Sequence, residues 1–177
     1  GGVEVSLQHG ESERFDSVVL AVHSDQALRM LADPRPEESA ILGDIEYQTN
    51  DCVLHTDERL LPSSQRAWSS WNYRVPDQPQ QRVSVTYNMN LLQSLASDDT
   101  YCVTLNGNSS VAGDRVIAEM TYHHPRYTLA SLSAQSRHAE ISGVSDTYYC
   151  GAYWGFGFHE DGVNSAIAVA AQFGKSA

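Results

Sequence analysis

The feature that most constrains the fold is a strand running directly into a helix, found once near each end of the chain. The continuous apolar run 18–22 leads to Ser24, which can cap a helix over residues 24–31. A second strand is predicted at 147–150, followed by a glycine-rich loop and a helix at 163–173. A buried strand that enters a helix is half of a βαβ unit, so both ends have the character of an α/β layer.

The sequence between these ends is rich in β-branched and aromatic residues. A short helix is predicted first at 36–43, because proline suits a first helical position and glycine a last one. Five β-rich runs follow, at 47–54, 67–73, 82–87, 101–105 and 116–123. They predict one antiparallel sheet, and the weakly apolar segment 127–140 predicts a helix that covers a face of it.

The chain is therefore expected to leave one layer, build another and return. We predict an α+β fold in which an antiparallel sheet domain with covering helices, residues 36–141, is inserted between residues 1–35 and 142–177. In this arrangement the two outer segments lie side by side.

The net charge and the cysteine content indicate which class of ligand and which cellular compartment to expect. The chain has 11 Lys and Arg against 22 Asp and Glu, a formal net charge of -11, so no basic stripe serves nucleic acid or anionic lipid. No apolar run approaches the ~20 residues of a membrane-spanning helix. Small molecules are the expected ligands. Cys52, Cys102 and Cys150 lie in separate strand-like runs without a CxxC pair, which predicts buried free thiols and a cytoplasmic protein.

The segment from Tyr148 to Gly162 is dense in glycine and aromatic residues just before a helix. Such a loop exposes backbone N–H groups at the positive end of the helix dipole, where a phosphate or a developing negative charge is stabilised. Its G-x-G-x-x-x-x-G spacing matches neither the Rossmann fingerprint nor a P-loop. An ordinary turn with a helix cap is the alternative.

Other chemical motifs are incomplete. His159 and Glu160 lack the second histidine of H-E-x-x-H, because position 163 is Val, which excludes a metalloprotease of that type. His123 and His124 are neighbours on a predicted strand and point to opposite faces, so they are expected to be a core histidine and a surface histidine and not a ligand pair. The sequence contains neither a nucleophile elbow nor a cysteine with a local histidine partner, so no motif indicates a hydrolase.

An aromatic and amide cluster lies on two successive predicted strands. Period-two alternation places Trp71 and Tyr73 on one face, with Tyr87 on the neighbouring strand. Aromatic walls with a few amides suit an apolar substrate pocket. The alternative is that these side chains fill the core.

Taken together, the segments resemble the flavin-containing amine-oxidase-like proteins, in a bacterial branch described as predicted NAD/FAD-binding proteins. Residues 15–28 are similar to the strand and helix that connect the two domains of that family. The resemblance continues in order over nearly the whole chain, at 53–57, 66–73, 85–93, 103–106, 122–125 and 150–162.

The resemblance implies a fold and a cofactor. It makes residues 1–35 and 142–177 the C-terminal remnant of a discontinuous, Rossmann-like FAD-binding domain, and residues 36–141 the inserted substrate-binding domain. Gly151 and Ala152 would pass beside the flavin pyrophosphate and ribitol. A helix start would approach the pyrimidine edge of the flavin, and its residues would be His159, Glu160, Asp161, Gly162 and Val163. Ala152 stands where many amine oxidases have an acidic residue.

The resemblance also implies a flavin-dependent oxidoreductase acting on a small molecule or lipid, which the aromatic residues suggest is apolar. The expected substrate-binding residues are Trp68, Trp71, Tyr73, Tyr87, Asn90 and His123. No catalytic residue is named. The family's N-terminal G-x-G-x-x-G half is absent, so this fragment alone is expected to be inactive, to lack FAD and to self-associate. The alternatives are a non-catalytic binding or scaffolding module and a metal site using His55, His123 or His159.

Overall fold

The computed structural model describes residues 1–7, 9–75 and 82–174, and the chain divides into two compact units. Unit 1 joins Gly1–Gln48 to Pro125–Ala177, and unit 2 is Thr49–His124. Assigning the outer segments to a cofactor domain and the middle to a substrate domain stays a prediction.

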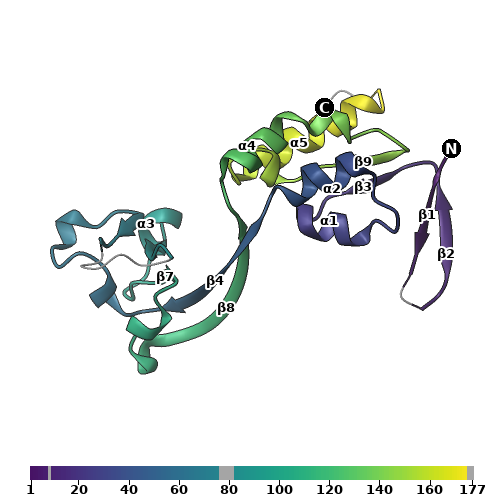
Figure 1. Ribbon diagram of the computed structural model, residues 1–177. Coiled ribbons are helices and arrows are strands. Elements are labelled where there is room, and N and C mark those ends of the chain that lie inside the picture. The colour runs from purple at the N-terminus through teal and green to yellow at the C-terminus, as the bar shows by residue number, and fades with distance from the viewer. Residues whose placement is uncertain (8, 76–81, 175–177) are drawn as a thin grey trace. The chain divides into compact units, whose positions relative to one another are not determined.

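Unit 1 contains two small sheets, one of which is packed among helices (Figure 1). Its elements are β1 (Val3–Ser6), β2 (Ser12–Phe15), β3 (Val18–Leu20), α1 (Ser24–Met30), α2 (Pro36–Gly43), α4 (Leu129–Ser136), β9 (Thr147–Tyr149) and α5 (His159–Gln172). β1 and β2 form an antiparallel hairpin, whereas β3 and β9 pair in parallel. The predicted meeting of the opening and closing segments is thus present in the structure.

The core of unit 1 is apolar. It consists of Leu20, Ala27, Ile41, Leu42, Ile45, Ala134, Ile141, Tyr149 and Tyr153. These residues come from the β3–β9 pair, from the helices α1, α2 and α4, and from the segments that follow them. Inside the core the Tyr149 hydroxyl donates to Glu38 Oε1 at 2.8 Å. Burial and the Glu38 carboxylate raise the pKa of Tyr149, so the phenol stays protonated and remains a donor.

Unit 2 is built on a five-stranded sheet in the order β5-β6-β7-β4-β8. Its elements are β4 (Tyr47–His55), β5 (Trp71–Tyr73), β6 (Val85–Asn88), α3 (Met89–Gln93), β7 (Cys102–Leu105) and β8 (Val116–Pro125). The pairs β5–β6, β6–β7 and β7–β4 are antiparallel. The five runs predicted from the sequence therefore do form one antiparallel sheet.

The helix predicted at 127–140 is present but does not have the predicted role. It consists of α4 and a separate 3-10 turn, His138–Glu140. Instead of covering the antiparallel sheet, α4 contacts α2, and its buried Ala134 enters the apolar core of unit 1. The few apolar residues of this helix indicated a buried face, but the sequence did not show which core receives it.

Several boundaries differ for local reasons. The strand predicted at 67–73 begins only at Trp71, because Gln65–Ala67 forms a 3-10 turn. The last helix begins one turn earlier than predicted, at His159. Two elements were not predicted. The charged residues of β2 give it no apolar pattern typical of a strand. The helix α3 has only five residues and is capped by the Asn88 side chain.

Two further predictions concern burial and membranes. Cys52, Cys102 and Cys150 are buried free thiols, as predicted, and burial raises the pKa of each thiol. Among the described residues, no helix has both the length and the apolar character needed to cross a membrane.

Candidate functional site

The parallel pair β3–β9 sets the position of the candidate cofactor loop. Val18 pairs with Thr147 and Leu20 with Tyr149, and the Cys150 N–H continues the ladder by donating to the Leu20 carbonyl at 3.2 Å. Parallel strands end at the same edge of a sheet, and the segments that leave this edge lead to α1 and α5. The glycine-rich loop therefore begins at the carboxyl end of a βα layer.

Gly151 begins the loop at a position with no room for a side chain. A β-carbon there would lie 2.5 Å from Cε1 of the buried Tyr153. The Gly151 N–H donates to Ser165 Oγ at 2.9 Å, and the Ser165 hydroxyl donates to the Gly162 carbonyl at 2.8 Å. Through these two hydrogen bonds, Ser165 connects the start of the loop to the second turn of α5.

Asp161 fixes the other end of the loop. Its Oδ2 accepts the N–H groups of Phe156 at 3.0 Å and Phe158 at 2.9 Å. Gly155 leaves the space for this carboxylate, since a β-carbon there would lie 2.5 Å from Asp161 Cγ. The Asp161 side chain therefore holds the loop and caps α5, and the cofactor contact predicted for this residue stays a prediction.

The remaining predicted cofactor residues lie along the same loop and helix start. Ala152 is half-buried in a 3-10 turn, Ala152–Trp154. His159 and Glu160 are exposed in the first turn of α5, and Val163 is exposed one turn later. Because no Lys or Arg is among them, an anion at this site would be held by backbone N–H groups and the helix dipole.

Three of the six predicted substrate residues come together on the sheet of unit 2. Trp71 lies directly opposite Tyr87, and their rings make an edge contact with centroids 5.4 Å apart. Tyr73 follows on the same face of β5. Trp71 and Tyr73 are 58% and 57% exposed, so these two side chains do not fill the core, whereas Tyr87 is half-buried.

The other three predicted substrate residues have different surroundings. The Trp68 Nε1–H donates to the Pro62 carbonyl at 2.8 Å. The Asn90 amide binds the Asp99 carbonyl and the Tyr101 N–H, each at 2.8 Å, and so shapes the turn before β7. His123 is exposed on β8, and His124 is exposed as well, so neither is the predicted core histidine. None of these three belongs to the β5–β6 pair that carries Trp71, Tyr73 and Tyr87.

The sheet of unit 2 differs from an ordinary half-buried sheet, in which the apolar face is buried and the polar face meets water. Directly opposite residues share a face, so the strand register assigns each face. The face that carries Trp71 also carries Cys52, Leu54, Tyr73, Val85, Tyr87, Val103 and Leu105. All of these except Cys52 are half-buried or exposed. The opposite face buries the polar side chains His55, Asn72, Thr86, Asn88 and Thr104 together with Val53 and Cys102.

The buried polar face contains a hydrogen-bond chain that sequence reasoning missed. His55 Nδ1 accepts the Asp57 N–H at 3.0 Å, so the neutral ring carries its proton on Nε2 and donates to Thr104 Oγ1 at 2.8 Å. Thr104 Oγ1 lies 2.8 Å from Thr86 Oγ1. Burial lowers the pKa of His55, which keeps it neutral. One member comes from each of β4, β7 and β6, so no pattern within a single strand signals the chain.

The histidine metal alternative finds no support in this geometry. Both ring nitrogens of His55 are engaged in hydrogen bonds, and His123 and His159 are exposed. Within the described ranges, no group of three or more His, Cys, Asp or Glu side chains is arranged to hold a metal ion.

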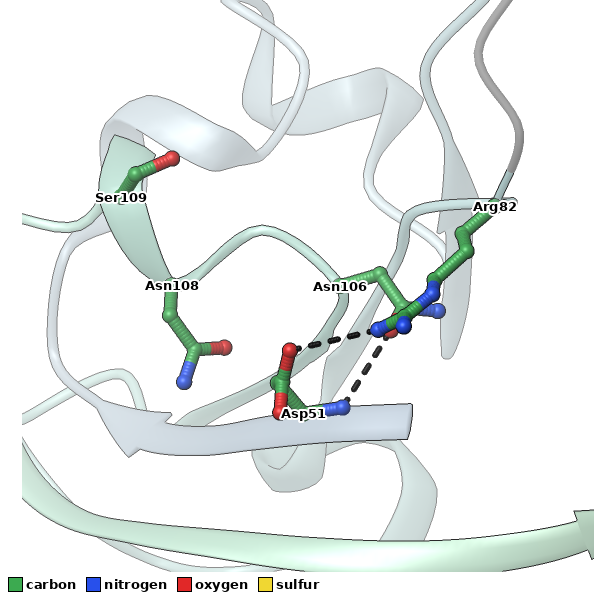
Figure 2. A pocket seen from close by; sticks show the side chains of 5 residues that line it. All are labelled: Asp51, Arg82, Asn106, Asn108 and Ser109. Carbon is green, nitrogen blue, oxygen red and sulfur yellow. Dashed lines mark hydrogen bonds and ion pairs between the residues drawn. The ribbon is translucent and has the colours of Figure 1, made fainter. Parts of the chain in front are cut away.

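A polar pocket of about 440 Å³ also lies in unit 2 (Figure 2). Asp51, Arg82, Asn106, Asn108 and Ser109 line it. Arg82 Nη1 donates to Asp51 Oδ2 at 3.4 Å, and the Asp51 N–H donates to Asn106 Oδ1 at 3.2 Å. None of the five residues belongs to the aromatic face.

The chain matches no protein-family model and no curated protein sequence, but its fold occurs in solved structures. These include a protein assigned as a protoporphyrinogen oxidase from Exiguobacterium sp. 255-15, with a TM-score of 0.60 and 14% identity. A reduced UDP-galactopyranose mutase matches with a TM-score of 0.61 and 12% identity. A CLA-producing fatty acid isomerase from P. acnes matches with a TM-score of 0.63 and 15% identity.

The matches cover 97–98% of this chain but only 44–45% of the solved chains, so the chain spans less than half the length of the proteins that it resembles. The chain therefore shares its fold with these proteins, whereas the division into a Rossmann-like remnant and an inserted domain stays a prediction. At 12–15% identity the likeness establishes the fold and not the activity.

Proposed function

We propose that this chain is the substrate-side part of an FAD-dependent oxidoreductase of the amine-oxidase-like kind. The observation that carries the proposal is the parallel pairing of β3 with β9, which joins the two ends of the chain into one βα layer and places the glycine-rich loop at its carboxyl edge. Nucleotides bind at this edge in open α/β sheets. The shared fold and the sequence resemblance indicate the same cofactor.

The loop residues fit part of FAD. Gly151 lets the backbone pass without a side chain. We propose Gly151, Ala152, His159, Glu160, Gly162 and Val163 as the segment beside the flavin, with Asp161 shaping it. FAD would supply the two-electron acceptor. The ADP portion needs the G-x-G-x-x-G turn of a dinucleotide-binding half, which this sequence does not contain.

The open face of the unit 2 sheet supports an apolar substrate. Exposed apolar patches on soluble proteins mark binding surfaces, and here Trp71, Tyr73 and Tyr87 form one on a single sheet face. We propose that these three side chains contact a small apolar molecule or lipid. The chain's part in the reaction is then to orient the substrate and exclude water.

The rival function is a non-catalytic binding or scaffolding module. Ala152, which stands where many amine oxidases have an acidic residue, favours it, because one cofactor contact is then missing. In that case the aromatic face binds its ligand without any redox step.

Unit 1 has surfaces that suit the proposed dinucleotide-binding half. Val163 and Ile167 are 51% and 42% exposed on one face of α5, and Val19 on β3 is 44% exposed. A parallel sheet is normally covered on both faces and extended by further strands. We therefore expect the isolated chain to be inactive, to lack FAD and to self-associate. Light scattering tests the last point, and a strictly monomeric chain would contradict it.

Fusion of this chain to a dinucleotide-binding half tests the function. The fusion protein should be yellow, with flavin absorption bands, and Gly151→Val should abolish the colour because its side chain would meet Tyr153. Gly113→Ala in unit 2 is the matched control, since its β-carbon would meet nothing within 4 Å. A colourless, correctly folded fusion protein favours the non-catalytic module.

A further inference from the structure

Gln135, a side chain of α4, contacts the glycine-rich loop from the neighbouring helix. Its Nε2 donates to the carbonyl oxygens of Tyr153 at 2.9 Å and of Gly155 at 2.6 Å. A carboxamide nitrogen carries two protons, so one side chain can satisfy both carbonyls. The two accepting residues lie between Gly151, where the loop begins, and Asp161, which closes it.

His138 holds the strand end that precedes the same loop. Its Nε2 lies 2.7 Å from the Tyr149 carbonyl oxygen, and because a carbonyl can only accept, the imidazole donates. The His138 ring also packs edge-on against Trp154, with centroids 4.4 Å apart. The segment of Gln135 and His138 therefore contacts the chain both before and after Gly151.

We propose that Gln135 is a positioning residue for the loop 151–157. It acts through the Tyr153 and Gly155 carbonyls, whose anchoring fixes the path of the backbone from the end of β9 to the start of α5. The inference rests on the proposed function, because this loop is the segment assigned to the cofactor. It adds a residue that neither the glycine pattern nor the family resemblance pointed to.

Two substitutions of similar shape can distinguish a hydrogen-bonding role of Gln135 from a role in packing alone. Gln135→Met fills similar space and has no donor at any pH. Gln135→Glu has no donor when ionised and directs a negative charge at two carbonyl oxygens, but regains one donor when protonated. Restoration by acid is therefore a signature of hydrogen-bond donation.

The experiment measures hydrogen exchange at individual amides of the flavin-free chain, at pH 7 and pH 5, after correction for intrinsic rates. The reporters are the N–H groups of Gly155 and Gly157, both of which donate to the Ala152 carbonyl. Gln135→Met should raise the hydrogen-exchange rates of these two amides about tenfold at both pH values. Gln135→Glu should do so at pH 7 and return to within about threefold of the parent at pH 5.

Two controls make the result decisive. Gln65→Glu makes the same charge change at an exposed residue of unit 2 and should leave both reporters unchanged. The Cys150 N–H, bonded to Leu20, should keep its protection in every variant. The proposal is overturned if Gln135→Met leaves the reporters protected, if Cys150 loses protection equally, or if acid does not restore Gln135→Glu. No flavin is involved, so this test and the colour test of the fusion protein fail independently.

Discussion

The two units bury different mixtures of side chains. Unit 1 encloses an apolar core that also holds the Glu38–Tyr149 hydrogen bond. Unit 2 buries a face on which His55, Thr104 and Thr86 are hydrogen-bonded in sequence beside Val53 and Cys102, whereas Trp71 and Tyr73 are exposed on the other face. Apolar burial stabilises in proportion to the area removed from water, whereas buried polar groups add little net stability and are costly when one partner is lost.

The difference shows what each unit is suited for. An apolar core makes unit 1 a rigid support for a loop whose geometry is set by side-chain anchors. In unit 2, the hydrogen bonds satisfy the polar groups of one face of the sheet, and the aromatic face is the surface that we propose to bind a ligand. Variants that act on one type of burial should therefore affect the two units differently.

The largest effect is expected from Ile41→Ala in unit 1. Ile41 is fully buried in the apolar core, and its truncation leaves a cavity, so the free energy of unfolding should fall by about 3–4 kcal/mol. Urea unfolding, with hydrogen exchange at β9 amides, measures the loss. The control is Leu129→Ala, at a side chain 88% exposed, which should change the free energy by less than about 0.5 kcal/mol. Equal effects of the two variants would disprove an apolar core as the main support of unit 1.

The second effect is expected from Thr104→Val in unit 2. The change keeps the shape of the side chain but removes the hydroxyl between His55 and Thr86, leaving the buried His55 N–H without an acceptor. We expect a loss of about 2 kcal/mol. Thr49→Val, at an exposed residue of β4, is the matched control and should be nearly neutral. If both variants are neutral, the polar chain contributes nothing to unit 2.

These two sites also show what the sequence could and could not predict. The strand-to-helix segments were predictable because a continuous apolar run followed by a helix cap is a local pattern. Period-two alternation placed Trp71 and Tyr73 on one face correctly. It could not decide which face is buried, because that depends on distant segments, such as the Ala112 N–H that donates to the Asp57 carboxylate at 2.9 Å.

The candidate loop was predicted in the same uneven way. Its glycines and the following helix are adjacent in sequence, so their association with a cofactor could be proposed. Its anchors could not be foreseen, since Gln135 is 18 residues before Tyr153 and Ser165 is 14 residues after Gly151. The Asp161 carboxylate accepts two loop N–H groups, a role that its place in the sequence did not reveal, and its predicted contact with the cofactor stays a prediction.

A smaller effect, specific to unit 2, is expected from acid. The pKa of His55 is lowered in the folded state from an unfolded value of about 6.5, so its contribution is complete above that pH. Stability should be lost as the pH falls from 6.5 toward the folded pKa, by at most about 1.4 kcal/mol per unit. Denaturant midpoints at several pH values measure the slope. His55→Gln should flatten it, whereas His123→Gln, at an exposed residue, should not, and identical slopes in the two variants would contradict the prediction.

The smallest effect on stability is expected from Trp71→Ala, on the open face of the same sheet. The side chain is 58% exposed and makes one edge contact with Tyr87, so the loss should be about 0.5–1 kcal/mol, well below the usual cost of removing a buried tryptophan. Binding of a fluorescent apolar dye to the chain should nevertheless fall several-fold, because the same ring supplies much of the open surface. A large loss of stability with unchanged dye binding would mean that Trp71 is a core residue. The aromatic face would then no longer distinguish unit 2 from unit 1.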